Sequence, residues 1–173
     1  MVDVRSRRCI FVSHCILAQC VMAKGMVRTF PGPVRPVLEF CLEHDINIMQ
    51  MPCPETLCPA GGLGRVPRGK KWYEEHGLRE TARSIAKGQT QYIERLLESG
   101  CRILGIVGVE FSPACAVSYL NKGHSIQQGT GIYMEELKAA LEAARVKIPM
   151  IGISQRWGNK MRHDLESLLT DKK

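Results

Sequence analysis

The stretch Arg102-Ile-Leu-Gly-Ile-Val-Gly-Val109 decides the expected fold, because it is apolar on both faces. A half-buried strand alternates apolar and polar residues. A central strand of a parallel sheet is covered on both sides and has a continuous apolar run. We therefore predict that residues 102–109 form a buried strand in a parallel sheet.

Other segments extend this pattern in both directions along the chain. Further short apolar runs occur at Cys9–His14, Ile46–Met51 and Ile148–Ser154. Helical patterns lie at Pro36–His44, Leu78–Ser99, Ile132–Arg145 and Trp157–Leu169. This alternation predicts one α/β domain over residues 1–173, with about four parallel strands and helices on both faces. We expect a doubly wound (Rossmann- or flavodoxin-like) sheet with strand order 2-1-3-4.

Composition limits the classes of protein to consider. The chain has 173 residues, 45% of them hydrophobic, and no apolar run long enough to cross a bilayer. Arg5-Ser-Arg-Arg8 and the apolar run after it resemble a secretory leader, but polar residues interrupt the run, which favours a buried strand. We therefore expect a cytoplasmic protein. The net charge of +7 favours anionic partners.

Eight cysteines are many for a chain of this length in a reducing compartment, where they more often bind metal or do chemistry. Cys15, Cys53 and Cys115 each follow a different predicted strand. Ligands of open parallel sheets bind beyond the carboxyl ends of the strands, so these three thiols are expected to converge there. Cys9, Cys41 and Cys101 are expected to be small core residues.

Three thiolates suit an iron–sulfur cluster with one iron left open, which can bind substrate and act as a Lewis acid. A second possibility involves Cys20 and Cys58. Each follows another cysteine in a Cys-x4-Cys spacing, and the resulting four thiols, at 15, 20, 53 and 58, could hold zinc.

Glu55 and Ser112 are expected at the same end of the sheet. Glu55 lies in Met51-Pro-Cys-Pro-Glu-Thr-Leu-Cys-Pro-Ala-Gly-Gly-Leu-Gly-Arg65, whose prolines and glycines predict a rigid loop without regular structure. A carboxylate there can position or deprotonate water, and a serine hydroxyl can stabilise a developing charge or relay a proton. The structural alternatives are that Glu55 caps a helix or pairs with Arg65, and that Ser112 makes a turn before Pro113.

Three motifs in this order resemble the thiouracil desulfidase (TudS) family. They are Val12-Ser-His-Cys-Ile-Leu17, then Cys53-Pro-Glu55 followed by Gly61-Gly-Leu63, then Ser112-Pro-Ala-Cys115. The resemblance implies a 4Fe–4S cluster held by Cys15, Cys53 and Cys115, with Glu55 as the catalytic glutamate and Ser112 assisting it. It also implies an enzyme of sulfur metabolism that removes sulfur from a thiolated nucleobase, nucleoside or tRNA base by hydrolysis. Hydrosulfide is then released without net electron transfer.

The chain departs from the family pattern in segments expected to line the substrate pocket. These are Cys20-Val-Met-Ala-Lys-Gly25, Leu57-Cys-Pro-Ala60 and Ala116. They leave the identity of the substrate open within the class that the resemblance implies, a small thiolated base or a thiolated tRNA. We expect no membrane and no obligate protein partner. For tRNA, Lys70 and Lys71 offer charge and Trp72 a stacking surface.

Two other functions remain open. The chain could carry a cluster or a persulfide without hydrolysing anything. It could also be a zinc-stabilised binding domain in which Cys115 is dispensable. A phosphate loop of the Cys-x5-Arg type is excluded, because Cys58 and Arg65 are one residue too far apart.

Overall fold

The computed structural model describes residues 3–123, 125–155 and 158–170. The strands are β1 (Arg8–Ser13), β2 (Asn47–Met51), β3 (Arg102–Val109), β4 (Tyr119–Lys122), β5 (Ser125–Gln128) and β6 (Met150–Ile153). The helices are α1 (His14–Leu17), η1 (Gln19–Val21), α2 (Arg35–Glu43), α3 (Pro54–Leu57), α4 (Lys70–Glu75), α5 (Leu78–Glu98), α6 (Ile132–Ala143) and α7 (Gly158–Glu166).

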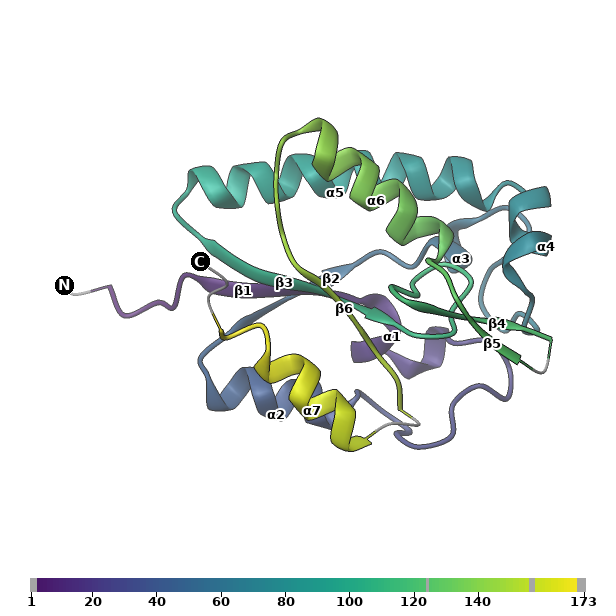
Figure 1. Cartoon of the computed structure of the whole chain (residues 1–173), viewed down its shortest axis with the longest axis horizontal. Coiled ribbons are helices and arrows are strands. Elements are labelled where there is room, and N and C mark those ends of the chain that lie inside the picture. Colours follow the sequence, from purple (N-terminus) through teal and green to yellow (C-terminus); the bar gives the residue numbers. More distant parts are fainter. Residues whose placement is uncertain (1–2, 124, 156–157, 171–173) are drawn as a thin grey trace.

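The main sheet has four parallel strands in the order β2-β1-β3-β6 (Figure 1). This is the predicted order, with β6 as the fourth strand. The chain first crosses from β1 to β2 on one side, then returns to add β3 on the other. The direction of winding therefore reverses between β1 and β3, and such a reversal opens a crevice at the carboxyl ends of these strands.

Helices cover both faces of this sheet, as predicted. In Figure 1, α5 and α6 lie on one face, and α2 and α7 lie on the other. Phe11 and Ile106 pack in the core beneath α5 and α6, whereas Ile10 and Val107 pack in the core beneath α2 and α7. Neighbouring residues of β1 and β3 thus enter opposite cores, which explains why both strands are apolar along most of their length.

The prediction that residues 51–65 contain no regular structure is wrong. Residues Pro54–Leu57 form the single turn of α3. Proline fits the first turn of a helix, because its missing N–H would have no partner there in any case. The rest of the segment is irregular, and Gly62 and Gly64 have φ values of 103° and 70°.

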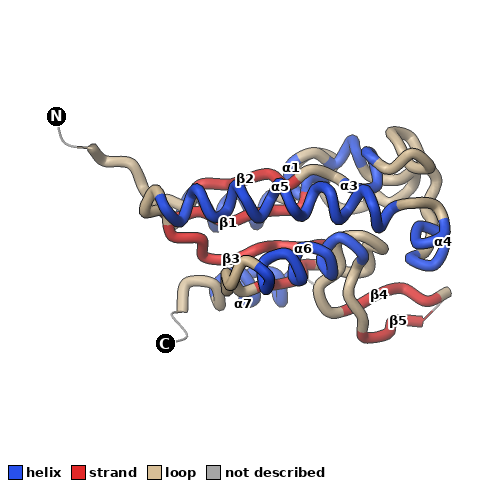
Figure 2. Tube along the Cα trace, turned by 90° about the horizontal axis from the view of Figure 1, so that it is seen from above, coloured by secondary structure: helices blue, strands red, loops and turns tan. Residues whose placement is uncertain are grey.

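Beyond the strand ends, α1, η1, α4 and an antiparallel hairpin of β4 and β5 were not predicted. Figure 2 shows α4 and the hairpin at the same end of the molecule. All four residues of β5 are exposed, so the hairpin lacks the apolar pattern that would reveal it.

The last helix ends at Glu166, short of the expected Leu169, and its expected start at Trp157 lies outside the described residues. Within the described part of the chain, no helix is long and apolar enough to cross a membrane.

Candidate active site

The three cysteines predicted to converge occupy the first turns or loops after three adjacent strands. Cys15 lies in α1, directly after β1. Cys53 is the N-cap residue of α3, just after β2, and Cys115 lies in the turn after β3. Figure 1 shows α1, α3 and the β4–β5 hairpin at one end of the sheet. The segments that carry these cysteines therefore follow the carboxyl ends of β1, β2 and β3, where the winding direction reverses.

These thiols lie near enough to influence one another's ionisation. The pKa of the Cys15 thiol is raised to about 12, mainly by burial and then by the nearby charges of Cys53 and Glu55. The pKa of Cys115 is raised well above its usual value, again mainly by burial, and next by Cys15, with Cys53 and Glu55 adding to the effect. Cys15 and Cys115 are therefore held as neutral thiols unless an electron-poor partner takes the proton's place.

Glu55 lies in the first turn of α3, and its two carboxylate oxygens have different partners. Arg65 donates to Oε2 from Nε at 3.0 Å and from Nη2 at 2.8 Å. Tyr73 also donates to Oε2, at 3.2 Å. Oε1 accepts a hydrogen bond from Ser112 Oγ at 3.2 Å. A carboxylate oxygen can accept about two hydrogen bonds, so Oε1 is the oxygen with capacity for a further donor.

Ser112 joins Glu55 to the loop that carries Cys115. Its hydroxyl oxygen accepts hydrogen bonds from the backbone N–H of Ala114 at 3.2 Å and of Cys115 at 3.0 Å. The turn expected before Pro113 and the contact with Glu55 are thus both present. The pairing of Glu55 with Arg65, considered as a structural alternative, is present as well. Glu55 and Ser112 thus have structural partners in Arg65 and in the Cys115 loop, and they also contact each other beside the candidate thiols.

The loop after β3 is fixed at its base by a buried glutamate. Glu110 is 5% exposed, and its carboxylate accepts hydrogen bonds from the backbone N–H groups of Ser118 and Tyr119, the latter at 2.9 Å. Between them, Phe111 has a φ of 69°, a left-handed conformation that is unusual for a bulky residue. Strain of this kind persists only where the surroundings impose it, and it is common beside functional sites.

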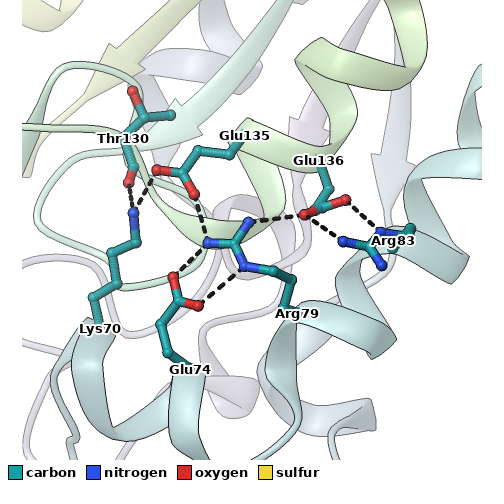
Figure 3. A network of polar contacts seen from close by, with 7 residues as sticks. All are labelled: Lys70, Glu74, Arg79, Arg83, Thr130, Glu135 and Glu136. Carbon is teal, nitrogen blue, oxygen red and sulfur yellow. Dashed lines mark hydrogen bonds and ion pairs between the residues drawn. The ribbon is translucent and has the colours of Figure 1, made fainter.

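Tyr73 reaches Glu55 because an ion-pair network anchors α4. Figure 3 shows Lys70 and Glu74 of α4 meeting Arg79 of α5 and Glu135 of α6. Lys70 also donates to the carbonyl of Thr130 at 2.9 Å. The network holds α4 beside α5 and α6, so the position of Tyr73 depends on three helices rather than on one.

The remaining cysteines are placed differently. Cys9 and Cys41 are 1% and 2% exposed, which confirms them as core residues, whereas Cys101 is only partly buried. Cys20 is exposed, and the buried Cys58 directs its thiol to the carbonyl of His76 at 3.4 Å. Among the described residues, no three Cys, His, Asp or Glu side chains are grouped to hold one metal ion. The four-cysteine zinc site is therefore not assembled.

An iron–sulfur cluster requires a different arrangement of ligands from a single metal ion. Its thiolates bind different iron atoms, so they lie further apart than the ligands of one ion. Soft thiols are the appropriate donors. Two buried hydroxyls nearby, Ser13 Oγ and Tyr133 Oη, have no hydrogen-bond partner. Buried polar atoms without a partner often mark an absent ion, water or cofactor. The donor set and these unpartnered hydroxyls fit an iron–sulfur cluster held by Cys15, Cys53 and Cys115.

Ser13, Tyr73 and Tyr133 were missed by sequence reasoning. Ser13 could have been noticed, because it lies in the Ser-x-Cys part of the first motif. The two tyrosines belong to α4 and α6, outside the motifs, and no local pattern marks them.

A pocket of about 540 Å³ lies elsewhere, between α6 and the edge strand β6. Met134, Leu141 and Met150 are among its lining residues, whereas Cys15, Glu55 and Cys115 are not. The candidate site is therefore defined by its side chains and not by this pocket.

The fold and the strand-end thiols define a doubly wound α/β protein with a cysteine-rich switch point. No protein-family model matches the chain. It is 26% identical to the uncharacterized protein MJ0003 of Methanocaldococcus jannaschii over 168 residues, or 96% of this chain and 99% of the relative. A solved structure, the 4Fe–4S-dependent thiouracil desulfidase TudS (DUF523Vcz), is similar with a TM-score of 0.52 at 18% identity, over 92% of this chain and 99% of that one. At this distance the similarity shows a shared fold.

Proposed function

We propose that this protein is a desulfidase that removes sulfur from a small thiolated nucleobase by hydrolysis, with a 4Fe–4S cluster held by Cys15, Cys53 and Cys115. The observation that carries the proposal is the contact set of Glu55, a carboxylate fixed beside three strand-end thiols. The fold shared with a thiouracil desulfidase supports the same reading. When bound, the cluster would supply an open iron that draws electrons from the sulfur of the substrate.

Glu55 then has the role of general base. Its Oε2 is occupied by Arg65 and Tyr73, which leaves Oε1 to accept a proton from water. Ser112 holds Oε1 in place and ties it to the Cys115 loop. The Glu55 carboxylate is thus held at a fixed position relative to the thiol-bearing loop, as acid–base catalysis by a positioned side chain requires.

The overall reaction balances without any oxidant or reductant. The carbon of the C=S group forms a bond to the oxygen of water, and its bond to sulfur breaks. Sulfur leaves as hydrosulfide, and the product carries C=O. One proton of the water passes to Glu55 and then to solvent, and the other leaves on sulfur as part of hydrosulfide, so the enzyme returns to its starting state.

A free base or nucleoside fits this site better than tRNA. Lys70 is committed to Glu135 and Thr130, and Arg65 to Glu55. The ring of Trp72 already stacks on His76 at 4.0 Å between ring centroids, with Arg68 over it. Lys71 is the member of this basic segment whose side chain is largely exposed, and its ammonium group lies 3.9 Å from the Glu75 carboxylate. The charge and stacking surface expected for RNA are therefore mostly used within the chain.

The test begins with iron and acid-labile sulfide content after anaerobic purification, followed by hydrosulfide release from thiouracil. We expect about four irons per chain, their loss in Cys115→Ala, and a cluster of normal content in Glu55→Gln. Turnover by Glu55→Gln should fall roughly 10²- to 10⁴-fold, the range typical of a lost general base.

Glu75→Gln is the matched control, because the Glu75 side chain is 57% exposed and pairs only loosely with Lys71, and the turnover of this variant should equal that of the wild type. A wild-type protein that holds the cluster but releases no hydrosulfide would favour the carrier function instead. Full activity in Glu55→Gln would remove Glu55 from the mechanism.

A further inference from the structure

Four buried side-chain atoms in the described part of the chain have no hydrogen-bond partner: Ser13 Oγ, Gln19 Oε1, Thr90 Oγ1 and Tyr133 Oη. An unpartnered buried hydroxyl is costly, so a stable fold normally supplies a partner. Two of the four, Ser13 and Tyr133, lie on elements that pack against the loop of Cys115. Tyr133 and Cys115 belong to one buried cluster, and β1, which ends at Ser13, pairs with β3, which leads into the Cys115 loop.

Rigid elements hold both hydroxyls against the Cys115 loop. Ser13 is the last residue of β1, pairs with Met51 of β2 and is 1% exposed. Tyr133 is fully buried in the first turn of α6. The backbone N–H of Tyr133 donates to the carbonyl of Ala114 at 2.9 Å, and that of Gly131 donates to Ala116 at 2.8 Å. The start of α6 is therefore bonded to the residues on either side of Cys115.

The chemistry of sulfur explains why these hydroxyls have no partner in the protein alone. A neutral thiol is a weak acceptor, whereas a thiolate bound to iron carries negative charge and accepts hydrogen bonds well. A hydroxyl beside Cys115 thus gains its partner when the cysteine becomes a ligand. Hydrogen bonds to ligand sulfur are among the features that set the reduction potential of an iron–sulfur cluster.

We propose that Ser13 and Tyr133 are positioning residues that donate hydrogen bonds to the sulfur of Cys115 when it is bound to iron. The inference rests on the proposed function, since it needs the cluster. These bonds withdraw electron density from the ligand sulfur, which keeps the cluster electron-poor. An electron-poor iron is the better Lewis acid, so the two hydroxyls would support desulfidation without touching the substrate.

The test is the reduction potential of the cluster in Ser13→Ala, Tyr133→Phe and the double variant, each purified anaerobically and measured by spectroelectrochemical titration. We expect cluster content near that of the wild type and a midpoint potential shifted to more negative values in each variant, most in the double one. Ser13→Thr keeps a hydroxyl and should restore the wild-type potential. If Ser13→Ala folds poorly, Ser13→Thr still allows the role of the Ser13 hydroxyl to be tested.

Matched controls remove similar groups away from Cys115. Thr90→Val removes another buried unpartnered hydroxyl, midway along α5, and Tyr92→Phe removes a half-exposed one. Both should retain the wild-type potential. Unchanged potentials in all Ser13 and Tyr133 variants that hold a cluster would overturn this inference and leave the desulfidase proposal intact. A wild-type protein without iron and sulfide would overturn both.

Discussion

Arg65 compensates a carboxylate that the fold has buried. The side chains of Arg65 and Glu55 are only 9% and 11% exposed, and they meet at 2.8 Å. Arg65 also donates to the carbonyl of Val21 at 2.7 Å, so one guanidinium joins the α3 segment to η1. Removal of one partner of a buried pair leaves the other without compensation, which costs far more than the pair contributes when intact.

We expect Arg65→Ala to lower the free energy of unfolding by about 3–5 kcal/mol, as is typical for a broken buried pair. Urea denaturation of the metal-free protein measures this directly. Arg83→Ala is the control, because the Arg83 side chain is 66% exposed where it pairs with Glu136, and its loss should cost about 1 kcal/mol or less. Similar costs for the two variants would contradict the account of a buried Glu55–Arg65 pair.

The contacts of Glu55 show what could be inferred from the residues and what could not. Its pairing with Arg65 was considered from the sequence, because the two residues share one loop. Tyr73 was not, because it approaches from α4 through the packing of three helices. The ligand and catalytic roles of Cys15, Cys53, Cys115, Glu55 and Ser112 stay predictions, to be decided by the assays above.

The junction between the β3 loop and α6 is closely packed. Gly131, the N-cap residue of α6, has an ordinary φ of −74°, so its backbone conformation does not require glycine. Space requires it instead, since an added Cβ would overlap the carbonyl group of Ala114. Any larger residue at this position must push the Cys115 loop away from the helix.

Gly131→Ala is therefore expected to destabilise the protein by about 1–3 kcal/mol, the usual cost of an overpacked site. It should also reduce the iron content, because Cys115 moves with the loop. Gly69→Ala is the matched control: Gly69 is the N-cap of α4, with a φ of −82° and no atom within 4 Å of an added Cβ. Thermal unfolding and iron analysis of both variants make the comparison. Equal iron content in the two would mean that the junction does not position Cys115.

Elements were predictable in proportion to how much of their surface is buried. The four sheet strands and the long helices were found because burial imposes an apolar run or a helical stripe. The β4–β5 hairpin and α4 were missed, since they pack at the end of the sheet, and β5 is wholly exposed. The turn of α3 was missed because Pro54 was taken to break structure, although proline suits the first turn of a helix.

Across the whole molecule, buried thiols couple stability to alkaline pH. The pKa values of Cys9 and Cys41 are raised from 9.0 to about 11, mainly by burial in both cases. A thiol with a higher pKa in the folded than in the unfolded chain stays protonated after the unfolded chain has lost its proton. Its contribution to stability is therefore present below pH 9 and is lost as the pH rises toward 11.

The free energy of unfolding of the metal-free protein should thus decrease between pH 9 and pH 11. In Cys41→Ala the decrease should be smaller, because one of the titrating thiols is gone. Urea denaturation at intervals across this range gives the slope of the free energy of unfolding against pH for both proteins. A packing loss lowers stability at every pH, whereas the missing thiol changes this slope. A wild-type stability that stays constant from pH 9 to pH 11 would refute the prediction.

The position of β1 in the middle of the sheet has a consequence for how the protein is made. Of the three strands that lead to the candidate thiols, β1 leaves the ribosome first, yet it needs β2 on one side and β3 on the other. Cys15 and Cys53 emerge long before Cys115, and their shared neighbourhood exists only after β3 has joined the sheet. A cofactor that requires all three thiols can therefore be completed only after translation of this region.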